Sequence, residues 1–311
     1  MMKAMILAAG LGTRLEPLTK IRPKPLFPVL NRPLLDITIE QIQRMGARGI
    51  IINAHHLAEQ VERFVSERQW GAEVEVRVEP EILGTGGGIK NCADFLHDVP
   101  FFLVVNADIY HTFDLGPVLH YHTEAKNLAT LVLCDYPRFN QVEIDHKGRI
   151  VSIRGESIKP STAATQVLTF TGIHIISPEI LNFMPSTGFF GIMELYMELV
   201  SQGKSIRGYH MNDGYWRDIG SVEAYKALHQ DFVGEQGEPV VHPEAYVEET
   251  VRMEGVVCIG KGSRIGAGSR IKDSIIWDRV LIEKGSSIEG CVVADGTQVK
   301  EAHQGEVLIP R

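Results

Sequence analysis

The sequence predicts an α/β domain with a mostly parallel sheet, followed by a β-helix built from hexapeptide repeats. Short buried apolar runs alternate with amphipathic stretches in the first part of the chain, which is typical of βαβ units. In the last part, apolar residues recur at every sixth position, which is typical of a β-helix. The chain has 311 residues, about twice an ordinary domain, so two domains are expected. We place the boundary at the polar segment 234–239, with a first domain over 1–233 and a second over 234–311.

The first half of the chain alternates strands with helices. The expected strands are 4–8, 49–54, 74–80 and 101–108, and the expected helices are 34–45 and 57–68. Strands that are apolar throughout indicate a parallel sheet that is covered on both faces. Ligands of such sheets bind beyond the carboxyl ends of the strands. Gly10–Arg14, Asn53–His56 and Asn106–Asp108 follow their strands directly, so we expect a binding site there.

The middle of the chain is less regular. The expected elements are strands at 128–134, 142–154 and 167–176, a helix at 191–202, a strand pair over 206–220 and a helix at 222–233. The strand pair would turn at Asp213-Gly214, and the helix at 222–233 would be the last element of the first domain.

The tail carries the six-residue period. The recurring positions are Val241, Val247, Met253, Ile259, Ile265 and Ile271, then Ile276, Ile282 and Ile288, and finally Val293 and Val299. Neither a helix nor an ordinary strand has this period, whereas a triangular coil with six residues a side does. About 60 residues give roughly three coils of about 18 residues each. The open ends of such a coil expose strand edges, so we expect the tail to mediate formation of a homo-oligomer.

Composition excludes several classes of protein. The net charge of -8 argues against a general nucleic-acid binder, and a hydrophobic fraction of 44% argues against disorder. No apolar run approaches the roughly 20 residues of a membrane span, and the apolar start is too short for a signal peptide. Four well-separated cysteines indicate a reduced compartment with neither a disulfide framework nor a zinc site. We therefore expect a cytoplasmic protein with no nucleic-acid or membrane partner.

The loop after the first strand has the features of a phosphate site. Gly10 and Gly12 let backbone N–H groups approach an oxygen-rich ligand, and Arg14 and Lys24 add positive charge. A P-loop would need GxxxxGK[ST], which is absent. The dinucleotide-binding fingerprint would need a third glycine where Leu15 stands. The sequence therefore argues against both a P-loop and a dinucleotide site.

Two further motifs complete the candidate site. Gly84–Gly88 is expected to be a loop, in which four glycines leave room for a flat ligand. Asp108 ends a buried strand, where it could cap the next element or hold Mg²⁺. Because Mg²⁺ takes one or two carboxylates plus phosphate oxygens, a partner acid is needed, and Asp218 is the best candidate.

Together these motifs resemble the signature of the sugar-1-phosphate nucleotidyltransferases. The matching segments are MILAAGLGTR (5–14), Pro17–Thr19, Pro23–Leu26, LGTGGG (83–88), Asn106–Asp108 and WRDIG (216–220). The resemblance covers the expected first domain, 1–233, and implies a Rossmann-like nucleotidyltransferase fold. The tail is similar to the left-handed β-helix of several members. The implied reaction joins an NTP and a sugar 1-phosphate into an NDP-sugar and pyrophosphate.

The resemblance also implies roles for individual residues. Arg14, Lys24 and Asp108 would be catalytic: Arg14 would hold the β- and γ-phosphates, and Lys24 would neutralise the α-phosphate and the sugar phosphate. Asp108 and Asp218 would hold Mg²⁺. The implied nucleotide-binding set is Leu7, Ala8, Ala9, Gly10, Gly12, Thr13, Arg14, Glu81, Gly84, Thr85, Gly86 and Gly87. The implied sugar-binding set is Asn140, Glu156, Lys159 and Gly172.

The base and the sugar have competing interpretations. Glu81, ahead of Leu83-Gly84-Thr85, is similar to members that make GDP-mannose, and a carboxylate can accept hydrogen bonds from guanine N1–H and N2–H₂. The triple glycine and the run 53–57 instead resemble uridylyltransferases that act on muramic-type sugars. We favour GTP and mannose 1-phosphate, with a UTP-dependent uridylyltransferase as the alternative.

Two other classes remain as rivals. A hexapeptide acyltransferase needs a longer β-helix and a histidine between coils, whereas His242 and His303 lie at the ends of the repeat. A non-catalytic regulatory subunit is the second rival. The presence of the full set Arg14, Lys24, Asp108 and Asp218 argues against it.

Overall fold

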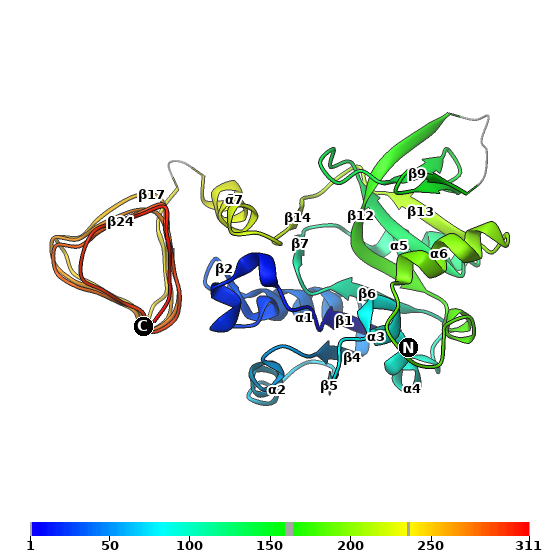
Figure 1. The fold of residues 1–311 in the computed structure, drawn as a ribbon, viewed down its shortest axis with the longest axis horizontal. Helices are drawn as coiled ribbons and strands as arrows, with labels where there is room; N and C mark the ends of the chain where they lie inside the picture. Colours follow the sequence, from blue (N-terminus) through cyan, green and yellow to red (C-terminus); the bar gives the residue numbers. More distant parts are fainter. Residues whose placement is uncertain (1, 159–163, 235–236, 311) are drawn as a thin grey trace. The chain divides into compact units, whose positions relative to one another are not determined.

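The computed structural model describes residues 2–158, 164–234 and 237–310 (Figure 1). Two compact units make up the chain: the first consists of Met1–Gly10 and Thr38–Arg217, and the second of Leu11–Ile37 and Asp218–Arg311. Packing thus groups an N-terminal segment with the tail, while the boundary at 233 and 234 stays a prediction from the sequence pattern. Within the ranges given above, no helix is long and apolar enough to cross a membrane.

A ten-stranded sheet forms the centre of the first unit. Its parallel strands are β1 (Met2–Ala8), β4 (Ala47–Ala54), β5 (Glu73–Val78) and β6 (Phe102–Asn106), in the order β6-β1-β4-β5. Each of them coincides with a strand expected from the sequence. The prediction of a mostly parallel sheet in this half of the chain is therefore confirmed.

The remaining strands of the sheet lie on the side of β6 that is away from β1. The long strand β12 (Thr165–Ile176) lies antiparallel to β6. The other strands are β8 (Ala129–Cys134), β9 (Val142–Asp145), β10 (Ile150–Ile153), β11 (Glu156–Ser157) and β13 (Ile206–His210). Three short strands lie outside this sheet: β2 (Pro28–Val29) pairs with β3 (Arg32–Pro33), and β7 (Ile109–His111) pairs with a strand described below.

Seven α-helices accompany these strands in the described ranges. They are α1 (Leu34–Arg44), α2 (Ala58–Ser66), α3 (Gly84–Asn91), α4 (Ala93–Leu96), α5 (Gly116–Glu124), α6 (Ile192–Ser201) and α7 (Val222–Val233). Single 3-10 turns lie at η1 (Thr13–Leu15), η2 (Leu18–Lys20), η3 (Lys24–Leu26) and η4 (Pro178–Asn182). A buried cluster joins Met5 of β1 and Val104 of β6 to Ile89 of α3 and Leu199 of α6, which fixes α3 beside the ends of the parallel strands.

The expectation of one strand over 142–154 is wrong, because this segment forms the hairpin β9-β10. The carboxylate of Asp145 accepts hydrogen bonds from the backbone N–H groups of Lys147 and Arg149, both at 2.9 Å. Gly148 has a φ of 71°, a conformation that glycine adopts at no steric cost. These two features turn the chain back on itself in the middle of the expected strand.

The expected strand pair over 206–220 is also wrong in its pairing. β13 pairs in parallel with β8, whereas β14 (Trp216–Asp218) pairs with β7. Asp213-Gly214 does form a turn, and Gly214 has a φ of 103°. The turn therefore connects two different sheets, which a local pattern of strand and turn residues does not distinguish from a hairpin.

The first unit contains buried histidines on a helix and on two strands: His122 on α5, His111 on β7 and His174 on β12. Nδ1 of His174 is hydrogen-bonded to Oη of Tyr196 on α6, with a separation of 2.6 Å. Burial lowers the pKa of His174 to about 3 and raises the pKa of Tyr196 well above its ordinary value. Burial also lowers the pKa values of His111 and His122 to about 4. The folded chain thus keeps these rings uncharged in mildly acidic solution.

We expect the free energy of unfolding to fall as the pH drops below about 6.5, the ordinary histidine pKa. Above that pH, His174 is neutral in both states. Below it, the unfolded chain binds a proton that the folded chain excludes until about pH 3. One such group contributes a slope of about 1.4 kcal/mol per pH unit. Urea titrations of the parent and of His174→Gln across this range measure the slope, and equal slopes would contradict the prediction.

The tail forms the predicted β-helix, and its coils trace a triangle in Figure 1. The strands are β15 (Val240–Val241), β16 (Tyr246–Val247), β17 (Arg252–Ile259), β18 (Arg264–Ile265), β19 (Arg270–Ile276), β20 (Leu281–Ile282), β21 (Ser287–Glu289), β22 (Val292–Val293), β23 (Gln298–Val299), β24 (His303–Gln304) and β25 (Val307–Leu308). All pairs between coils are parallel. The slip in the six-residue period shortens a coil: Val241 pairs with Ile259 after three full repeats, whereas Ile259 pairs with Ile276, one position short of three repeats. The apolar positions therefore stay stacked.

Candidate active site

The carboxyl ends of the parallel strands β4, β1 and β6 lie side by side at one edge of the sheet. Leu7, near the end of β1, is in register with Asn53 of β4 on one side and with Asn106 of β6 on the other. Ala107 N–H donates to the carbonyl oxygen of Leu7 at 2.9 Å, which fixes the chain just ahead of Asp108. The strand ends of the first unit thus gather the start of the glycine loop and the Asn106–Asp108 motif.

A buried Asn–Glu pair braces this edge. Asn53 Oδ1 accepts from the backbone N–H of Ala8 at 2.8 Å, and Asn53 Nδ2 donates to Glu79 Oε1 at 2.7 Å. The other carboxylate oxygen of Glu79 accepts from the backbone N–H of Leu83 at 3.1 Å. Both side chains are almost fully buried, at 2% and 1% exposure. The brace ties the end of β1 to the segment that leads into α3.

Sequence reasoning missed Glu79 and chose Glu81, whose side chain is exposed. Both acids lie in Glu79-Pro80-Glu81, between the strand β5 and the glycine cluster. The strand β5 is half-buried over 74–77 and exposed at both ends, so its burial gives no indication of which acid turns inward. Only the partner, Asn53, distinguishes them, and it is 26 residues away.

The expectation that Gly84–Gly88 is a loop is wrong, because these residues form the first turns of α3. The N–H groups of Gly86 and Gly87 donate to the carbonyl oxygen of Phe190 at 3.0 and 3.3 Å. A Cβ at Gly86 would overlap the ring of Phe190, and one at Gly87 would lie 2.7 Å from Gly188 O. Close packing of 188–190 therefore explains these two glycines, and tertiary contacts outweigh their poor helix propensity. Thr85 stays exposed and its Oγ1 accepts from Ile192 N–H at 2.9 Å.

The segment 11–26, called the phosphate loop below after its predicted role, belongs to the second unit. Gly12 has a φ of 65°, and a Cβ there would lie 2.8 Å from Thr19 Cγ2, so the tight turn requires glycine. Leu15 N–H closes the turn on Gly12 O at 2.9 Å. Among the described residues, none accepts a hydrogen bond from the N–H groups of Leu11, Gly12 or Thr13. Oriented N–H groups of this kind can bind an anion.

Each cation of the phosphate loop lies close to a glycine: Lys24 to Gly12 in the same loop, and Arg14 to Gly220 outside it. The side chain of Lys24 is buried, and its Cβ lies 3.8 Å from where a Cβ of Gly12 would stand. Arg14 is exposed, with Nη2 2.8 Å from the corresponding position at Gly220. Gly220 N–H in turn donates to Asp218 Oδ1. The second unit thus brings together Arg14 and Asp218–Gly220, which lie far apart in sequence.

In the first unit, Asn106 lies against the predicted sugar loop. Gly172 has a φ of 80°, and a Cβ there would lie 2.7 Å from Asn106 Nδ2. Trp216 Nε1 donates to the carbonyl oxygen of Thr171 at 2.9 Å. Asp108 follows Asn106 in the turn between β6 and β7 and is half-buried. Gly172 and the Asn106–Asp108 motif are therefore neighbours, although they are distant from each other in sequence.

Two other sugar candidates, Asn140 and Glu156, also belong to the first unit. Asn140 Oδ1 accepts from Tyr136 N–H at 3.1 Å and from Thr169 Oγ1 at 2.8 Å, and its Nδ2 donates to Asp135 at 2.8 Å. This side chain closes its own loop. Glu156 is exposed on β11, the edge strand of the sheet. Lys159 lies outside the described residues.

The acidic residues fit a metal that is shared with a substrate. In the ranges that the structure covers, no group of three or more His, Cys, Asp or Glu side chains could hold a metal ion by itself. Asp108 of the first unit and Asp218 of the second each carry hard oxygen ligands of the kind that Mg²⁺ prefers, and Mg²⁺ commonly completes its shell with phosphate oxygens and water. Each carboxylate by itself therefore suits a cation that also takes ligands from a substrate.

Comparisons with known proteins agree with the geometry of these motifs. The Nucleotidyl transferase family model matches residues 3–234, and the GMPPB C-terminal domain model matches residues 235–306. A mannose-1-phosphate guanylyltransferase of Mycobacterium tuberculosis is 30% identical over 92% of this chain and 82% of the relative. A UTP–glucose-1-phosphate uridylyltransferase of Synechocystis is 29% identical over 94% of this chain and 82% of the relative. The crystal structure of HddC from Yersinia pseudotuberculosis complexed with GMP-PN has 26% identity and a TM-score of 0.60, covering 75% of this chain and 100% of that one. The chain therefore belongs to the nucleotidyl transferase family and is a sugar-1-phosphate nucleotidyltransferase, which makes an NDP-sugar and pyrophosphate from an NTP and a sugar 1-phosphate.

Proposed function

We propose that the nucleotide is GTP, that the sugar is mannose 1-phosphate and that the product is GDP-mannose. The observation that carries this is the similarity over nearly the whole chain to a mannose-1-phosphate guanylyltransferase, together with the match of the tail to the GMPPB C-terminal domain. The related structure that holds GMP-PN also supports a guanine nucleotide. Glu81 is exposed just ahead of α3, where its carboxylate can accept from guanine N1–H and N2–H₂.

The proposed reaction needs charge neutralisation more than proton transfer. An oxygen of the sugar phosphate attacks the α-phosphorus of the NTP, a P–O bond forms, and the bond to pyrophosphate breaks with its electron pair. Because the attacking oxygen is already ionised, no general base is required. Two anions must approach each other, so positioned cations and N–H groups lower the barrier.

Each candidate residue has a place in this proposal. The N–H groups of Gly12 and Thr13 bind phosphate oxygens, Arg14 holds the β- and γ-phosphates, and Lys24 neutralises charge at the α-phosphate. The remaining nucleotide contacts are Leu7, Ala8, Ala9, Gly10, Glu81, Gly84, Thr85, Gly86 and Gly87. The sugar contacts are Gly172, Asn140, Glu156 and Lys159. Gly172 is the best supported of these four, because it packs against Asn106.

A divalent metal, which the family generally uses, would be held by Asp108 and Asp218. When bound, Mg²⁺ would add positive charge at the phosphates. The two carboxylates would be the ligands that the chain itself supplies to the metal, and in this proposal their ionised oxygens face the nucleotide.

A UTP-dependent reaction is the alternative, and one observation favours it. The uridylyltransferase of Synechocystis covers slightly more of this chain than the guanylyltransferase does, at nearly the same identity. Whole-chain similarity therefore supports both bases, and Glu81 together with the GMP-PN complex favours guanine.

A substrate matrix tests the proposal. Pyrophosphate release is measured with Mg²⁺ for GTP, UTP, ATP, CTP and dTTP, each with mannose, glucose and N-acetylmuramic acid 1-phosphates. GTP with mannose 1-phosphate is expected to give the highest kcat/KM, and reactions without sugar phosphate are the blanks. A higher value for any UTP pair would establish the uridylyltransferase alternative, whereas no release with any pair would favour a regulatory subunit.

We also propose that the tail's first coil joins subunits into a homo-oligomer. Tyr246 and Val241 expose 58% and 36% of their surface on the edge strands β16 and β15. Tyr246→Lys is therefore expected to lower the mass in light scattering. Leu281→Lys is the matched control, because Leu281 is also exposed but lies on the inner strand β20. A monomeric parent, or equal effects of the two changes, would contradict the proposal.

A further inference from the structure

Arg22 is a nearly buried cation on the phosphate loop. It lies between Arg14 and Lys24 in sequence, and its side chain is only 12% exposed. Its guanidinium reaches the tail, where Nε and Nη2 donate to Asp295 Oδ2 at 2.9 and 2.6 Å and Nη2 also donates to Asp278 Oδ2 at 2.9 Å. Nη1 turns back to Leu26 O at 3.3 Å. One side chain thus links the loop to two carboxylates of the β-helix.

The two carboxylates are built into successive coils at the same corner. Asp278 Oδ1 accepts from the N–H of Lys261 at 2.9 Å, and Asp295 Oδ1 accepts from the N–H of Asp278 at 3.0 Å, each pair 17 residues apart. Each acid therefore uses one oxygen to hold a neighbouring coil and the other to hold Arg22. Burial by itself lowers the pKa of Arg22, but the two carboxylates outweigh burial and raise it above its ordinary value.

Aromatic contacts fix the same junction. The guanidinium of Arg22 lies 5.3 Å from the ring centre of Trp277, and Phe27 packs against Trp277 with ring centres 4.7 Å apart. Trp277 Nε1 donates to Tyr225 Oη at 3.1 Å. Asn31 Nδ2 donates to two tail carbonyls, those of Val240 and Ile259, at 2.8 and 2.9 Å. The segment from Arg22 to Asn31 is thus held against α7 and the first coils.

We propose that Arg22 is a positioning residue whose attachment to Asp278 and Asp295 makes the β-helix the support of the substrate loop. A guanidinium is planar and presents its N–H donors in a rigid fork. Hydrogen bonds that hold this group of Arg22 therefore also restrain the backbone of the loop that carries Arg14 and Lys24. The carboxylates also occupy Arg22, which would otherwise compete with its neighbours for substrate phosphates. This inference rests on the proposed roles of Arg14 and Lys24, and it gives the tail a part in turnover besides assembly.

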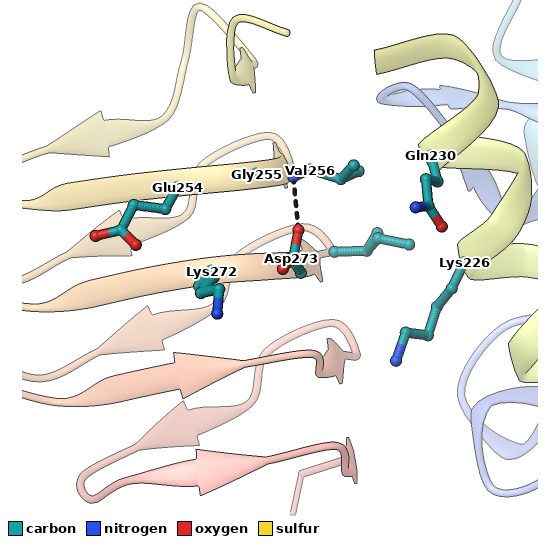
Figure 2. A pocket seen from close by; sticks show the side chains of 8 residues that line it. Lys226, Gln230, Glu254, Gly255, Val256, Lys272 and Asp273 are labelled. Carbon is teal, nitrogen blue, oxygen red and sulfur yellow. Dashed lines mark hydrogen bonds between the residues drawn. The ribbon is translucent and has the colours of Figure 1, made fainter. Parts of the chain in front are cut away.

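The chain supplies a matched control. Asp273 is another corner acid, and its Oδ1 accepts from Val256 N–H at 3.0 Å (Figure 2). It lines a hollow of about 540 Å³ with Lys226 and Lys272, as Figure 2 shows, and not one of the residues lining that hollow belongs to 11–37. Asp295→Asn and Asp273→Asn each keep an oxygen for the coil hydrogen bond. Only Asp295→Asn removes charge from Arg22.

The test compares these variants in the full-length chain, without and with substrates. Asp295→Asn is expected to increase amide deuterium uptake over 11–26 and to lower kcat roughly tenfold to a hundredfold, with the KM for the NTP changed less than about threefold. Asp273→Asn is expected to match the parent in both readouts. Arg22→Lys should fall between the parent and Arg22→Met, since it keeps the charge without the fork.

A double variant shows whether the effect passes through Arg22. If it does, Asp295→Asn adds little to Arg22→Met, because the group it acts on is already absent. Additive losses in kcat, or equal behaviour of Asp295→Asn and Asp273→Asn, would overturn the inference. Deuterium uptake reads the loop without turnover, so a parent that releases no pyrophosphate would contradict the proposed function while the uptake still decides whether Asp295 and Arg22 hold the loop.

Discussion

Replacing Asp108 with asparagine is expected to lower kcat by about 10²–10³-fold with GTP and mannose 1-phosphate. Asparagine keeps the shape of the side chain and removes its charge, so the turn between β6 and β7 is preserved. What is lost is an ionised oxygen for the metal that neutralises the phosphates. The proposal places this loss mainly in the transition state, where charge builds up on the departing pyrophosphate.

Pyrophosphate release measured against Mg²⁺ concentration checks the prediction. Asp108→Asn should need more Mg²⁺ for half-maximal rate and should stay slow at saturation. Asp114→Asn is the matched control, because Asp114 is exposed on the next connection, between β7 and α5, and its Oδ1 accepts only from the nearby Gly116 N–H at 3.0 Å in the contacts described. Turnover of Asp108→Asn equal to that of the parent would remove Asp108 from the metal site.

The corresponding change at Asp218 tests whether the two acids act as a unit. Asparagine can still accept from Gly220 N–H through Oδ1, so the contact that orders the loop beside Arg14 is kept. If both carboxylates bind one ion, the double variant should be scarcely slower than the slower single variant. Multiplicative losses would instead indicate separate roles for the two acids.

The fold could be predicted wherever burial leaves a uniform local pattern. The strand over 49–54 carries the apolar run Ile50–Ile52 because a central parallel strand is covered on both faces, and β4 is found there. The six-residue period of the tail is equally local, because each coil repeats the same turn and the same inward position. The failures have a different origin. Gly86 and Gly87 are helical because a carbonyl from a distant part of the chain, that of Phe190, accepts their N–H groups.

The candidate site shows the same division between local and distant causes. Gly12 and Arg14 could be selected from the sequence, since a glycine turn after a buried strand is a local phosphate signature. Arg22 could not, because its carboxylate partner Asp295 is 273 residues away and both lie in segments with many other charges. Pairs of buried polar residues have no fixed spacing, so only the folded chain identifies them.

Glu79→Ala is expected to lower the free energy of unfolding of the first unit by roughly 2–5 kcal/mol. The carboxylate accepts from Asn53 Nδ2 and from Leu83 N–H, and without it the buried amide of Asn53 and the partly buried N–H of Leu83 would lose their acceptor. Each unsatisfied buried donor costs about 1–3 kcal/mol. Asn53 would also be free to rotate away from Ala8, which loosens the start of the glycine loop.

Urea unfolding followed by helical circular dichroism measures this effect, because α2, α3, α5 and α6 all belong to the first unit. The matched control is Glu81→Ala, two positions further along the chain, where the side chain is exposed and the free energy of unfolding should change by no more than about 0.5 kcal/mol.

The two variants distinguish an effect on stability from an effect on the choice of base. Glu81→Ala should instead reduce the preference for GTP over UTP, since it removes the proposed guanine contact and leaves the brace intact. A stable Glu79→Ala protein would show that the Asn53–Glu79 pair does not hold this edge of the sheet, and an unchanged base preference in Glu81→Ala would place guanine recognition on other residues.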